Sequence, residues 1–310
     1  MEQITAAICT YDRYDVLEKA IESLCQQTLD SNQYKIIIVD NSPDHQKAKA
    51  FGRTFKKNHQ IDYLIEKKVG LSNARNVAFQ NCSSEYITYI DDDAIAKEDY
   101  LEKILFAFNK HKANIVGGRV DPIWSRERPP WLGDDLLGHV SVVNWGGKLR
   151  IAQAEEWFAG TNVAFSVESL KETGGFSTNL GRKGNGKILL SNEESELINS
   201  IKEKDGVIVY QPEAIVDHLV VEDRLNRKWF RKRMAWQATS DFLMNPDQCI
   251  SQSKSHWEKI IEYSSNVPPR ERSLKSLMLE TDSSELFYEQ LCAIYSWTVL
   301  NLAGFEGLSN

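Results

Sequence analysis

The chain has 310 residues, of which 42% are hydrophobic and 26% are charged, so it is long enough for one large or two modest domains with a buried core. Its formal net charge of −7 argues against general nucleic-acid binding, and we expect no nucleic-acid partner. The five cysteines form no CxxC pair and no Cys/His cluster, which argues against a disulfide framework and a zinc site.

We expect a cytoplasmic setting, because the cysteines are scattered and the first residues do not have the basic and apolar pattern of a signal peptide. Strands and helices then alternate over the first 110 residues. Apolar runs predict strands at 4–9, 35–39, 61–65 and 85–90, and helices that begin at Asp15, Ser72 and Tyr100. Alternation of this kind indicates βαβ units. We therefore expect an α/β fold with a Rossmann-like, mostly parallel central sheet flanked by helices.

The pattern changes after about residue 114. The sequence predicts strands at 115–116 and 156–165, separated by a loop-like stretch over 122–150. A short helix then ends at Gly174, and a further helix begins at Glu193. Strands near 207–210 and 214–220 follow, and the last eighty-odd residues are predicted to be helices. The chain therefore closes with a helical C-terminal extension.

Three consecutive carboxylates, Asp91, Asp92 and Asp93, follow the apolar strand at 85–90. Thr10 and Asp40 also come directly after strands. Ligands of open parallel sheets bind beyond the carboxyl ends of the strands, so we expect these residues to converge on one crevice. Carboxylates suit magnesium or manganese there, and the alternative is a solvated acidic turn.

An ordered set of motifs resembles the family 2 glycosyltransferases, which have the GT-A fold. The motifs are ICTYDR, IIIVDNS, GLSNARN, the DxD-like YIDDDA, the acceptor-side FAGTNVAFSVESLKETGGF, and NEESELINSIKEKDGVIVYQPEAIVDH. The resemblance implies a GT-A domain over 1–225, with a nucleotide-binding half at 1–120 and an acceptor-side half at 121–225. Residues 226–310 form the helical extension.

The resemblance also implies a metal-dependent glycosyltransferase of the hexosyltransferase type. It would move a sugar with inversion from a nucleotide-sugar donor, expected to be UDP-linked, to a hydroxyl of a saccharide, lipid-linked or protein acceptor. Polysaccharide, glycolipid or glycoprotein glycan synthesis is the expected setting. One alternative is a sugar nucleotidyltransferase, although ICTYDRYD lacks the glycines of its phosphate loop. Another is an inactive homologue that binds nucleotide sugar without turnover.

Site residues follow from the same resemblance. The set expected to bind the nucleotide sugar is Thr10, Asp40, Arg75, Asp91, Asp92 and Asp93. Asp40 would accept a hydrogen bond from the base. Asp93 would contact the metal, manganese or magnesium, with Asp91 nearer the ribose and the metal's waters, while Asp92 points away. His218 either completes the metal site or is structural.

The acidic helix start holds the expected catalytic residues. The resemblance places Glu194 at the usual position of the general base. Glu193 is the alternative, because the family usually has the shorter Asp there. A plain helix-dipole role for both carboxylates is the non-catalytic alternative. Arg75 would pair with Asp40 or with a phosphate, and a structural ion pair is favoured. The resemblance places Trp157, Thr161 and Asn162 on the acceptor side, and a core role is the alternative for the tryptophan.

Two basic stretches have open roles. Gly181–Lys187 spells GxxxxGK, but Ile188 follows it and no strand feeds it, so a P-loop is not expected. The stretch would instead close over the diphosphate through Arg182, Lys183 or Lys187.

The second stretch, 224–233 or RLNRKWFRKR, carries six cations and no acid. Peripheral contact with the inner face of an anionic membrane, diphosphate binding and a solvated helix face all remain open for it. The apolar stretch Leu286–Phe305 contains Glu289, Gln290 and Asn301, which argue against a membrane span. It is expected to be a packing helix or a homodimer helix.

Overall fold

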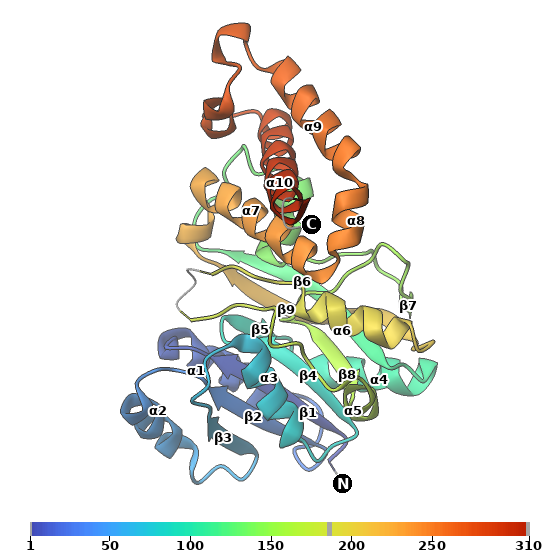
Figure 1. Cartoon of the computed structure of the whole chain (residues 1–310). Helices are drawn as coiled ribbons and strands as arrows, with labels where there is room; N and C mark the ends of the chain where they lie inside the picture. The colour runs from blue at the N-terminus through green and yellow to red at the C-terminus, as the bar shows by residue number, and fades with distance from the viewer. Residues whose placement is uncertain (1, 185–187, 308–310) are drawn as a thin grey trace. The chain divides into compact units, whose positions relative to one another are not determined.

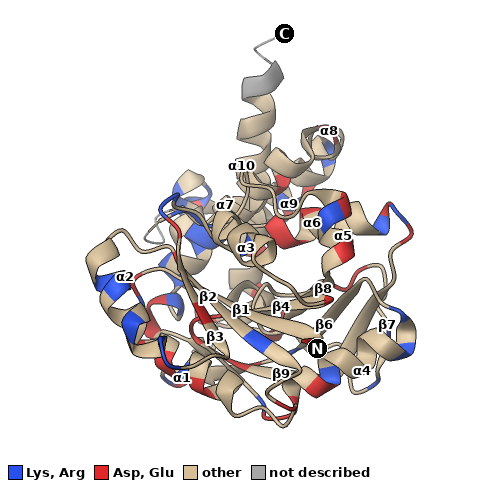
Figure 2. Ribbon diagram, turned by 90° about the horizontal axis from the view of Figure 1, so that it is seen from below, with Lys and Arg blue, Asp and Glu red and all other residues tan. Residues whose placement is uncertain are grey.

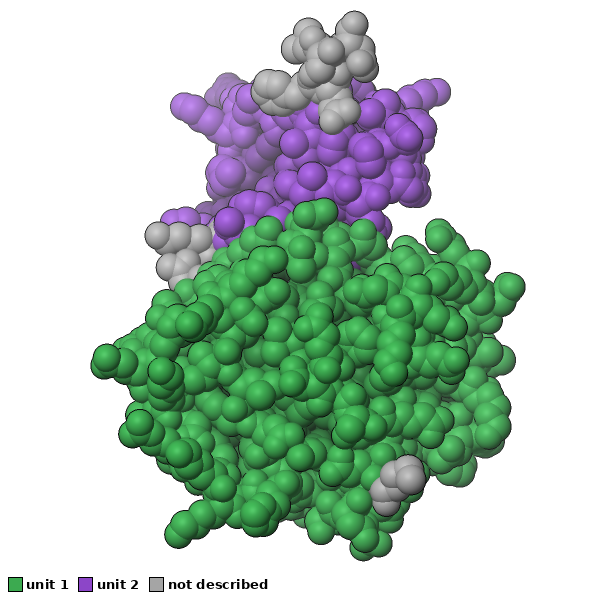
Figure 3. Space-filling model, turned by 60° about the horizontal axis from the view of Figure 1, so that its bottom comes forward, with its two compact units in different colours: residues 1–123, 141–187, 193–219 green, residues 124–140, 188–192, 220–310 purple. Residues whose placement is uncertain are grey.

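A computed structural model describes residues 2–184 and 188–307, and its chain divides into two compact units (Figure 3). Unit 1 comprises residues 1–123, 141–187 and 193–219. Unit 2 comprises residues 124–140, 188–192 and 220–310. The units are interleaved along the chain, because two short segments inside the first 220 residues belong to the second unit. The functional division at residue 225 stays a prediction.

The described residues form one nine-stranded sheet with the order β3-β2-β1-β4-β8-β6-β9-β5, in which β7 also pairs with β9 (Figure 1). The strands are β1 (Ile4–Thr10), β2 (Tyr34–Asp40), β3 (Ile61–Ile65), β4 (Tyr86–Asp91), β5 (Ala94–Ala96), β6 (Ile115–Trp124), β7 (Arg150–Ile151), β8 (Val163–Ser166) and β9 (Ile208–Val220). Strands β3, β2, β1 and β4 are parallel, whereas β8 joins β4 and β6 antiparallel, and β5 and β7 join β9 antiparallel. The predicted α/β fold with a Rossmann-like parallel half is confirmed.

Helices cover both faces of the sheet, because its strands are apolar on both sides. The helices of unit 1 are α1 (Tyr14–Cys25), α2 (His45–Gly52), α3 (Leu71–Gln80), α4 (Tyr100–His111), α5 (Val167–Thr173) and α6 (Glu193–Lys202). Ile4, Ala6 and Ile8 of β1 pack with α1 and α4, whereas Ala7 packs with α3, α5 and α6 on the other face. This alternation along one strand assigns each of these helices to one face of the sheet.

Several predicted elements differ from the structure. Helix α1 begins at Tyr14 with Arg13 at its cap, so Asp15 lies in the first turn. The strand expected over 156–165 is present only as β8, because the preceding residues turn and Asn162 N donates to Ala159 O at 2.9 Å. The two strands expected near 207–210 and 214–220 are the single strand β9, which runs through Pro212. Helix α2 and strand β5 were not predicted.

Unit 2 is built from α7 (Arg227–Met244), α8 (Pro246–Ser251), α9 (Ser253–Asn266) and α10 (Ser284–Gly307). Helix α10 packs against both α7 and α9, with Phe287, Leu291 and Val299 fully buried. Trp131, from the segment 124–140, meets Phe287 edge to face with ring centroids 5.1 Å apart. The packing role expected for 286–305 is confirmed. Among the described residues, no helix combines the length and the apolar character needed to cross a membrane.

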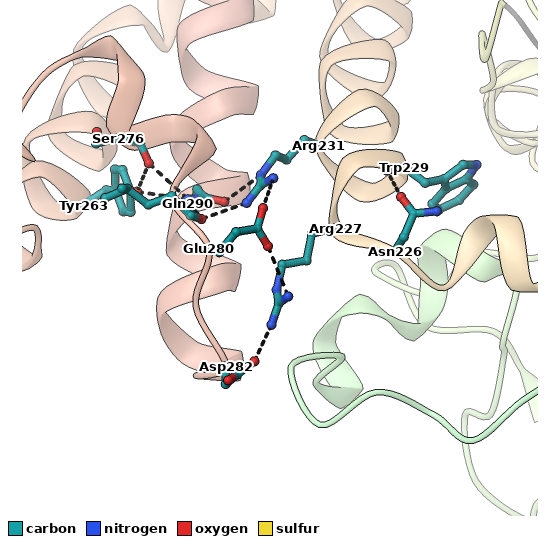
Figure 4. A network of polar contacts seen from close by, with 10 residues as sticks. Asn226, Arg227, Trp229, Arg231, Tyr263, Ser276, Glu280, Asp282 and Gln290 are labelled. Carbon is teal, nitrogen blue, oxygen red and sulfur yellow. Dashed lines mark hydrogen bonds and ion pairs between the residues drawn. The ribbon is translucent and has the colours of Figure 1, made fainter.

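The basic segment 224–233 belongs to unit 2, and one of its cations, Arg231, is buried there. Arg227 contacts Glu280 at 3.1 Å and Asp282 at 2.6 Å, and Arg231 contacts Glu280 at 2.9 Å (Figure 4). Arg231 Nε also donates to Gln290 Oε1 at 3.0 Å. Arg227 and Arg231, two of the six cations, therefore form ion pairs with the loop before α10 and are mostly shielded from solvent.

Candidate active site

The carboxyl ends of the parallel strands bring the predicted residues to one edge. In the sheet register Thr10 lies opposite Asp40, and Cys9 lies opposite Asp91. Residues as far apart in sequence as Thr10 and Asp91 therefore end at one level, as the alternating pattern predicted.

Asp92 is held inside this edge by two donors. Thr10 Oγ1 donates to Asp92 Oδ2 at 2.8 Å, and Arg13 Nη1 donates to Asp92 Oδ1 at 2.9 Å. Burial raises the pKa of Asp92 to about 7, although the ion pair with Arg13 opposes this rise. Both carboxylate oxygens bond within the protein, so a direct contact of Asp92 with the donor stays a prediction.

Asp91, Asp93 and His218 form a group of potential metal ligands. One atom from each lies within 4.8 Å of the other two. His218 Nε2 is 3.4 Å from Asp93 Oδ1, and both side chains are almost completely buried. One imidazole nitrogen and two carboxylates suit a divalent cation such as manganese. Burying a histidine and an aspartate together also costs free energy that bound metal would offset. The residues therefore fit the metal implied by the resemblance.

Arg75 lies between Asp91, one of the candidate metal ligands, and the two glutamates Glu193 and Glu194. Its Nη1 lies 2.7 Å from Glu194 Oε1 and 3.1 Å from Glu193 Oε1, and its Nη2 lies 3.9 Å from Asp91 Oδ1. The guanidinium is buried and lies over the ring of Phe176, 5.4 Å from its centroid. A structural ion pair of Arg75 is present, but its partners are Glu193, Glu194 and Asp91 and not the expected Asp40, because Arg75 reaches across to α6. Contact of Arg75 with a phosphate stays a prediction.

The first turn of α6 carries three glutamates, and Figure 2 draws Asp and Glu in red. Two of the three, Glu193 and Glu194, contact Arg75 and differ in exposure. The side chain of Glu194 is 16% exposed and that of Glu193 is 4% exposed. Burial, reinforced by the neighbouring Glu194, raises the pKa of Glu193 to about 8. A neutral Glu193 cannot remove a proton at pH 7, so these surroundings favour Glu194 for that task.

Two glycines make room for this pair of glutamates. A Cβ on Gly160 would lie 1.9 Å from Glu194 Oε1 and 2.2 Å from Arg75 Nη2. Gly181 has φ of +86°, and a Cβ there would lie 2.6 Å from Ser72 Oγ and 3.1 Å from Glu193 Cδ. Both motifs named in the sequence, FAGTN and the glycine-rich loop, therefore contribute backbone close to the carboxylates.

Asp40 is completely buried and already has three donors. Ser42 N donates to Asp40 Oδ1 at 2.9 Å, Tyr14 OH donates to Oδ2 at 2.8 Å, and Tyr63 OH donates to Oδ2 as well. Burial and Asp40 together raise the pKa of Tyr63. A base N–H would have to replace one of these donors, so base binding by Asp40 stays a prediction.

The three acceptor-side residues have different surroundings. Trp157 is 36% exposed and meets Trp145 edge to face at 6.2 Å. Thr161 is buried, and its Oγ1 accepts from Asp91 N at 3.2 Å. Asn162 is fully buried, and its Nδ2 donates to Arg119 O and Ala214 O at 2.8 and 2.9 Å. Trp157 can therefore meet a ligand, whereas Thr161 and Asn162 shape the site from within.

The basic loop lies close to α3. Leu71 N donates to Arg182 O at 3.1 Å, and the charge of Arg182 helps to lower the pKa of Glu193 against the effect of burial. Lys183 is also within the described range, whereas Lys187 lies outside the described residues. Closure of this loop over a diphosphate stays a prediction.

Sequence reasoning missed Arg13, Tyr14 and Tyr63, which bind the buried aspartates. Arg13 and Tyr14 follow directly after β1 and so belong to the same edge as Asp92, a signal that the motif ICTYDR contained. Tyr63 lies within β3 and has no such signal, because its contact with Asp40 depends on the strand pairing.

Comparisons with known proteins identify the family of this chain and its type of fold. The family model described as "Glycosyl transferase family 2" matches residues 5–172. Glucosyl-dolichyl phosphate glucuronosyltransferase from Haloferax volcanii is 26% identical over 250 residues, which are 78% of this chain and 77% of that protein.

Among solved structures, mannosyltransferase PcManGT from Pyrobaculum calidifontis, in complex with GDP-Man and Mn2+, matches with a TM-score of 0.57 and 14% identity. The match covers 97% of this chain and 75% of that chain. S. aureus TarS in complex with UDP matches with a TM-score of 0.54 and 13% identity over 98% and 92% of the two chains. These likenesses confirm the predicted GT-A type of fold.

Proposed function

Starting from the fact that this chain belongs to glycosyl transferase family 2 and is a glycosyltransferase, we propose that it moves a sugar from a nucleotide-sugar donor to an acceptor hydroxyl with inversion, using a divalent metal. One observation carries the proposal. Arg75 contacts Glu194 at 2.7 Å and Asp91 at 3.9 Å, so one guanidinium separates the candidate base from a candidate metal ligand. Deprotonation of the acceptor and stabilisation of the leaving group thus belong to one small region.

The donor end of the site consists of Asp91, Asp93 and His218, which would hold manganese or magnesium. When bound, the metal supplies Lewis-acid stabilisation of the negative charge on a diphosphate leaving group. The chain itself supplies the orientation: Thr161 Oγ1 accepts from the backbone of Asp91, and Asp93 is held between Arg13 and His218. The neighbour solved with GDP-Man and Mn2+ and the neighbour solved with UDP support a nucleotide-sugar donor, and we propose a UDP-linked sugar.

The proposed general base is Glu194. Its carboxylate is more exposed than that of Glu193, and Arg75 fixes its direction. A base must lie within hydrogen-bond reach of the hydroxyl from which it removes the proton. Glu194 would take that proton from the acceptor as the hydroxyl oxygen attacks the anomeric carbon and the bond to the diphosphate breaks. A single attack of this kind inverts the anomeric configuration.

The proposed acceptor is a sugar or hydroxyl carried on a lipid or a growing polysaccharide. The name of the Haloferax volcanii relative, a glucosyl-dolichyl phosphate glucuronosyltransferase, supports a lipid-linked acceptor. Trp157 gives an exposed aromatic face on the segment 156–162, and aromatic rings pack well against the apolar faces of sugars.

The test is a panel of UDP- and GDP-linked sugars, first screened for thermal stabilisation with Mn²⁺ and then assayed for transfer to polyprenyl-phosphate-linked saccharides. The proposal expects one donor to stabilise the protein and to release nucleoside diphosphate only with metal and acceptor. Pyrophosphate release from a nucleoside triphosphate would instead identify a sugar nucleotidyltransferase. Binding of a donor without any transfer would identify an inactive homologue.

Glu194→Gln is expected to lower turnover about 100-fold or more, in line with general-base contributions, and to leave UDP affinity nearly unchanged. Glu193→Gln is the matched control on the same helix turn. Full activity in Glu194→Gln together with an inactive Glu193→Gln would move the base to Glu193. Full activity in both variants would remove α6 from the mechanism.

A further inference from the structure

Arg13 holds two neighbouring aspartates with the two arms of one guanidinium. Nη1 lies 2.9 Å from Asp92 Oδ1, and Nη2 lies 2.8 Å from Asp93 Oδ2. The side chain of Arg13 is 35% exposed, whereas those of Asp92 and Asp93 are 7% and 1% exposed. A planar fork can contact two carboxylates at once with a fixed spacing, which a single ammonium group cannot do.

The fork determines which oxygen of Asp93 is available. Oδ2 faces Arg13, and Oδ1 faces His218 Nε2 at 3.4 Å. Thr10 Oγ1 donates to Asp92 Oδ2 at 2.8 Å, so the carboxylate that Arg13 contacts through Oδ1 is itself held at its second oxygen. Asp93 is thereby fixed with one oxygen toward the candidate metal ligands and the other oxygen engaged by a cation.

Coordination by one oxygen has a chemical consequence. Mg²⁺ requires nearly octahedral geometry and is usually held by one or two carboxylates together with waters, whereas Ca²⁺ takes six to eight oxygens and can bind a carboxylate through both of its oxygens. A carboxylate whose second oxygen is held by an arginine offers only one ligand. Such a carboxylate therefore suits the smaller octahedral cations better than Ca²⁺.

We infer that Arg13 is a positioning residue that keeps Asp93 coordinating through one oxygen and thereby makes the site select Mn²⁺ over Ca²⁺. The inference rests on the proposed metal site and adds to it the residue that sets metal choice. Arg13 acts through Asp93 and needs no contact with the metal or the substrate.

The experiment measures binding of Mn²⁺ and of Ca²⁺ by calorimetry, and of Mn²⁺ also by electron paramagnetic resonance, in the whole chain, first with the cation alone and then with UDP. Arg13→Lys keeps the charge but removes the fork, and Arg13→Gln removes both. Arg119→Lys is the matched control, because Arg119 is similarly exposed at 37% and pairs with Asp121 through one nitrogen at 2.8 Å. Thermal unfolding of each variant reports whether it is folded.

In the wild type we expect Mn²⁺ to bind more tightly than Ca²⁺. In Arg13→Lys we expect Mn²⁺ affinity to fall roughly 10- to 100-fold, the usual effect of removing a partner of a metal ligand, and the ratio of Mn²⁺ to Ca²⁺ affinity to fall with it. Arg13→Gln should lose the same selectivity, and Arg119→Lys should behave as the wild type.

An unchanged affinity ratio in Arg13→Lys would overturn the inference, because the charge alone would then suffice. A wild type that binds Mn²⁺ no better than Ca²⁺ would also overturn it. A wild type that binds neither cation, with or without UDP, would instead refute the metal dependence of the proposed function.

Discussion

Gly160 offers the sharpest test of the link between Arg75 and Glu194. A Cβ at this position would lie 1.9 Å from Glu194 Oε1 and 2.2 Å from Arg75 Nη2, whereas real Cβ contacts stay beyond 3.0 Å. Gly160→Ala therefore forces the Glu194 oxygen to retreat by at least about 1 Å. Both affected atoms are the ends of long side chains, so the backbone of the segment 156–162 can stay in place.

The expected effects on stability and on turnover differ in size. The variant weakens one charge-assisted hydrogen bond, which corresponds to about 1.5 to 3 kcal/mol of unfolding free energy. Turnover should fall about 100-fold, because a reacting group displaced by about 1 Å loses its productive alignment. Donor affinity should change little, since Asp93 and His218 are not among the atoms closest to the new Cβ.

The assay combines urea unfolding, calorimetry with UDP and Mn²⁺, and steady-state transfer with the donor found in the nucleotide-sugar panel. Gly147→Ala is the matched control, because a Cβ there meets nothing within 4 Å among the described residues. Gly160→Ala with wild-type turnover would refute the reasoning, since the placement of Glu194 by Arg75 would then have no role in transfer.

Three further predictions concern the metal, pH and membranes. Asp93→Ala should lower transfer by about two orders of magnitude or more and make UDP affinity insensitive to EDTA, whereas Asp62→Ala, which removes a surface partner of Lys35, should change neither. Burial raises the pKa of Glu193 in the folded state to about 8. The contribution of Glu193 to the unfolding free energy should therefore be fully present below pH 4.5 and be lost as the pH rises toward about 8. Urea unfolding of Glu193→Gln should show a flatter pH dependence over this window. If the acceptor is lipid-linked, the segment 224–233 should bind anionic vesicles at low salt through its exposed Lys228 and Lys232. Each of these charges should contribute about 1 kcal/mol to binding. Equal co-sedimentation of the wild type and of the double variant Lys228→Glu/Lys232→Glu would contradict this.

The central sheet could be predicted because its strands are short apolar runs that end in polar residues. A strand that is buried on both faces is a continuous run of apolar residues in the sequence. The first polar residues after these runs placed the strand ends at Thr10, Asp40 and Asp91. Strand β9 was divided at Pro212 because proline normally interrupts a strand. In the structure β7 pairs with Val209 and Tyr210, and β5 pairs from Val216 onward, so neither pairing needs the N–H that proline lacks.

Most contacts of the candidate site could not be read from the sequence. Arg75 and Glu194 are 119 residues apart, and no local pattern relates them. Asn162 was expected to face the acceptor, whereas its side chain satisfies two backbone carbonyls of the sheet, a demand that only the folded neighbours create. The types of residue and their edge of the sheet were predictable, but their partners depend on loops whose paths the sequence does not specify.

The interleaving of the two units has a consequence for cutting and recombining this chain. The segment 124–140 packs within unit 2, where Trp131 lies edge to face on Phe230 at 5.5 Å and Arg126 donates to Leu225 O. A truncation after residue 225 would remove Phe230 and Phe287, the two rings that pack on the buried Trp131. A chimera that exchanges residues 226–310 between relatives therefore has to exchange 124–140 with them, so the C-terminal helices are not a module that one crossover point can transfer.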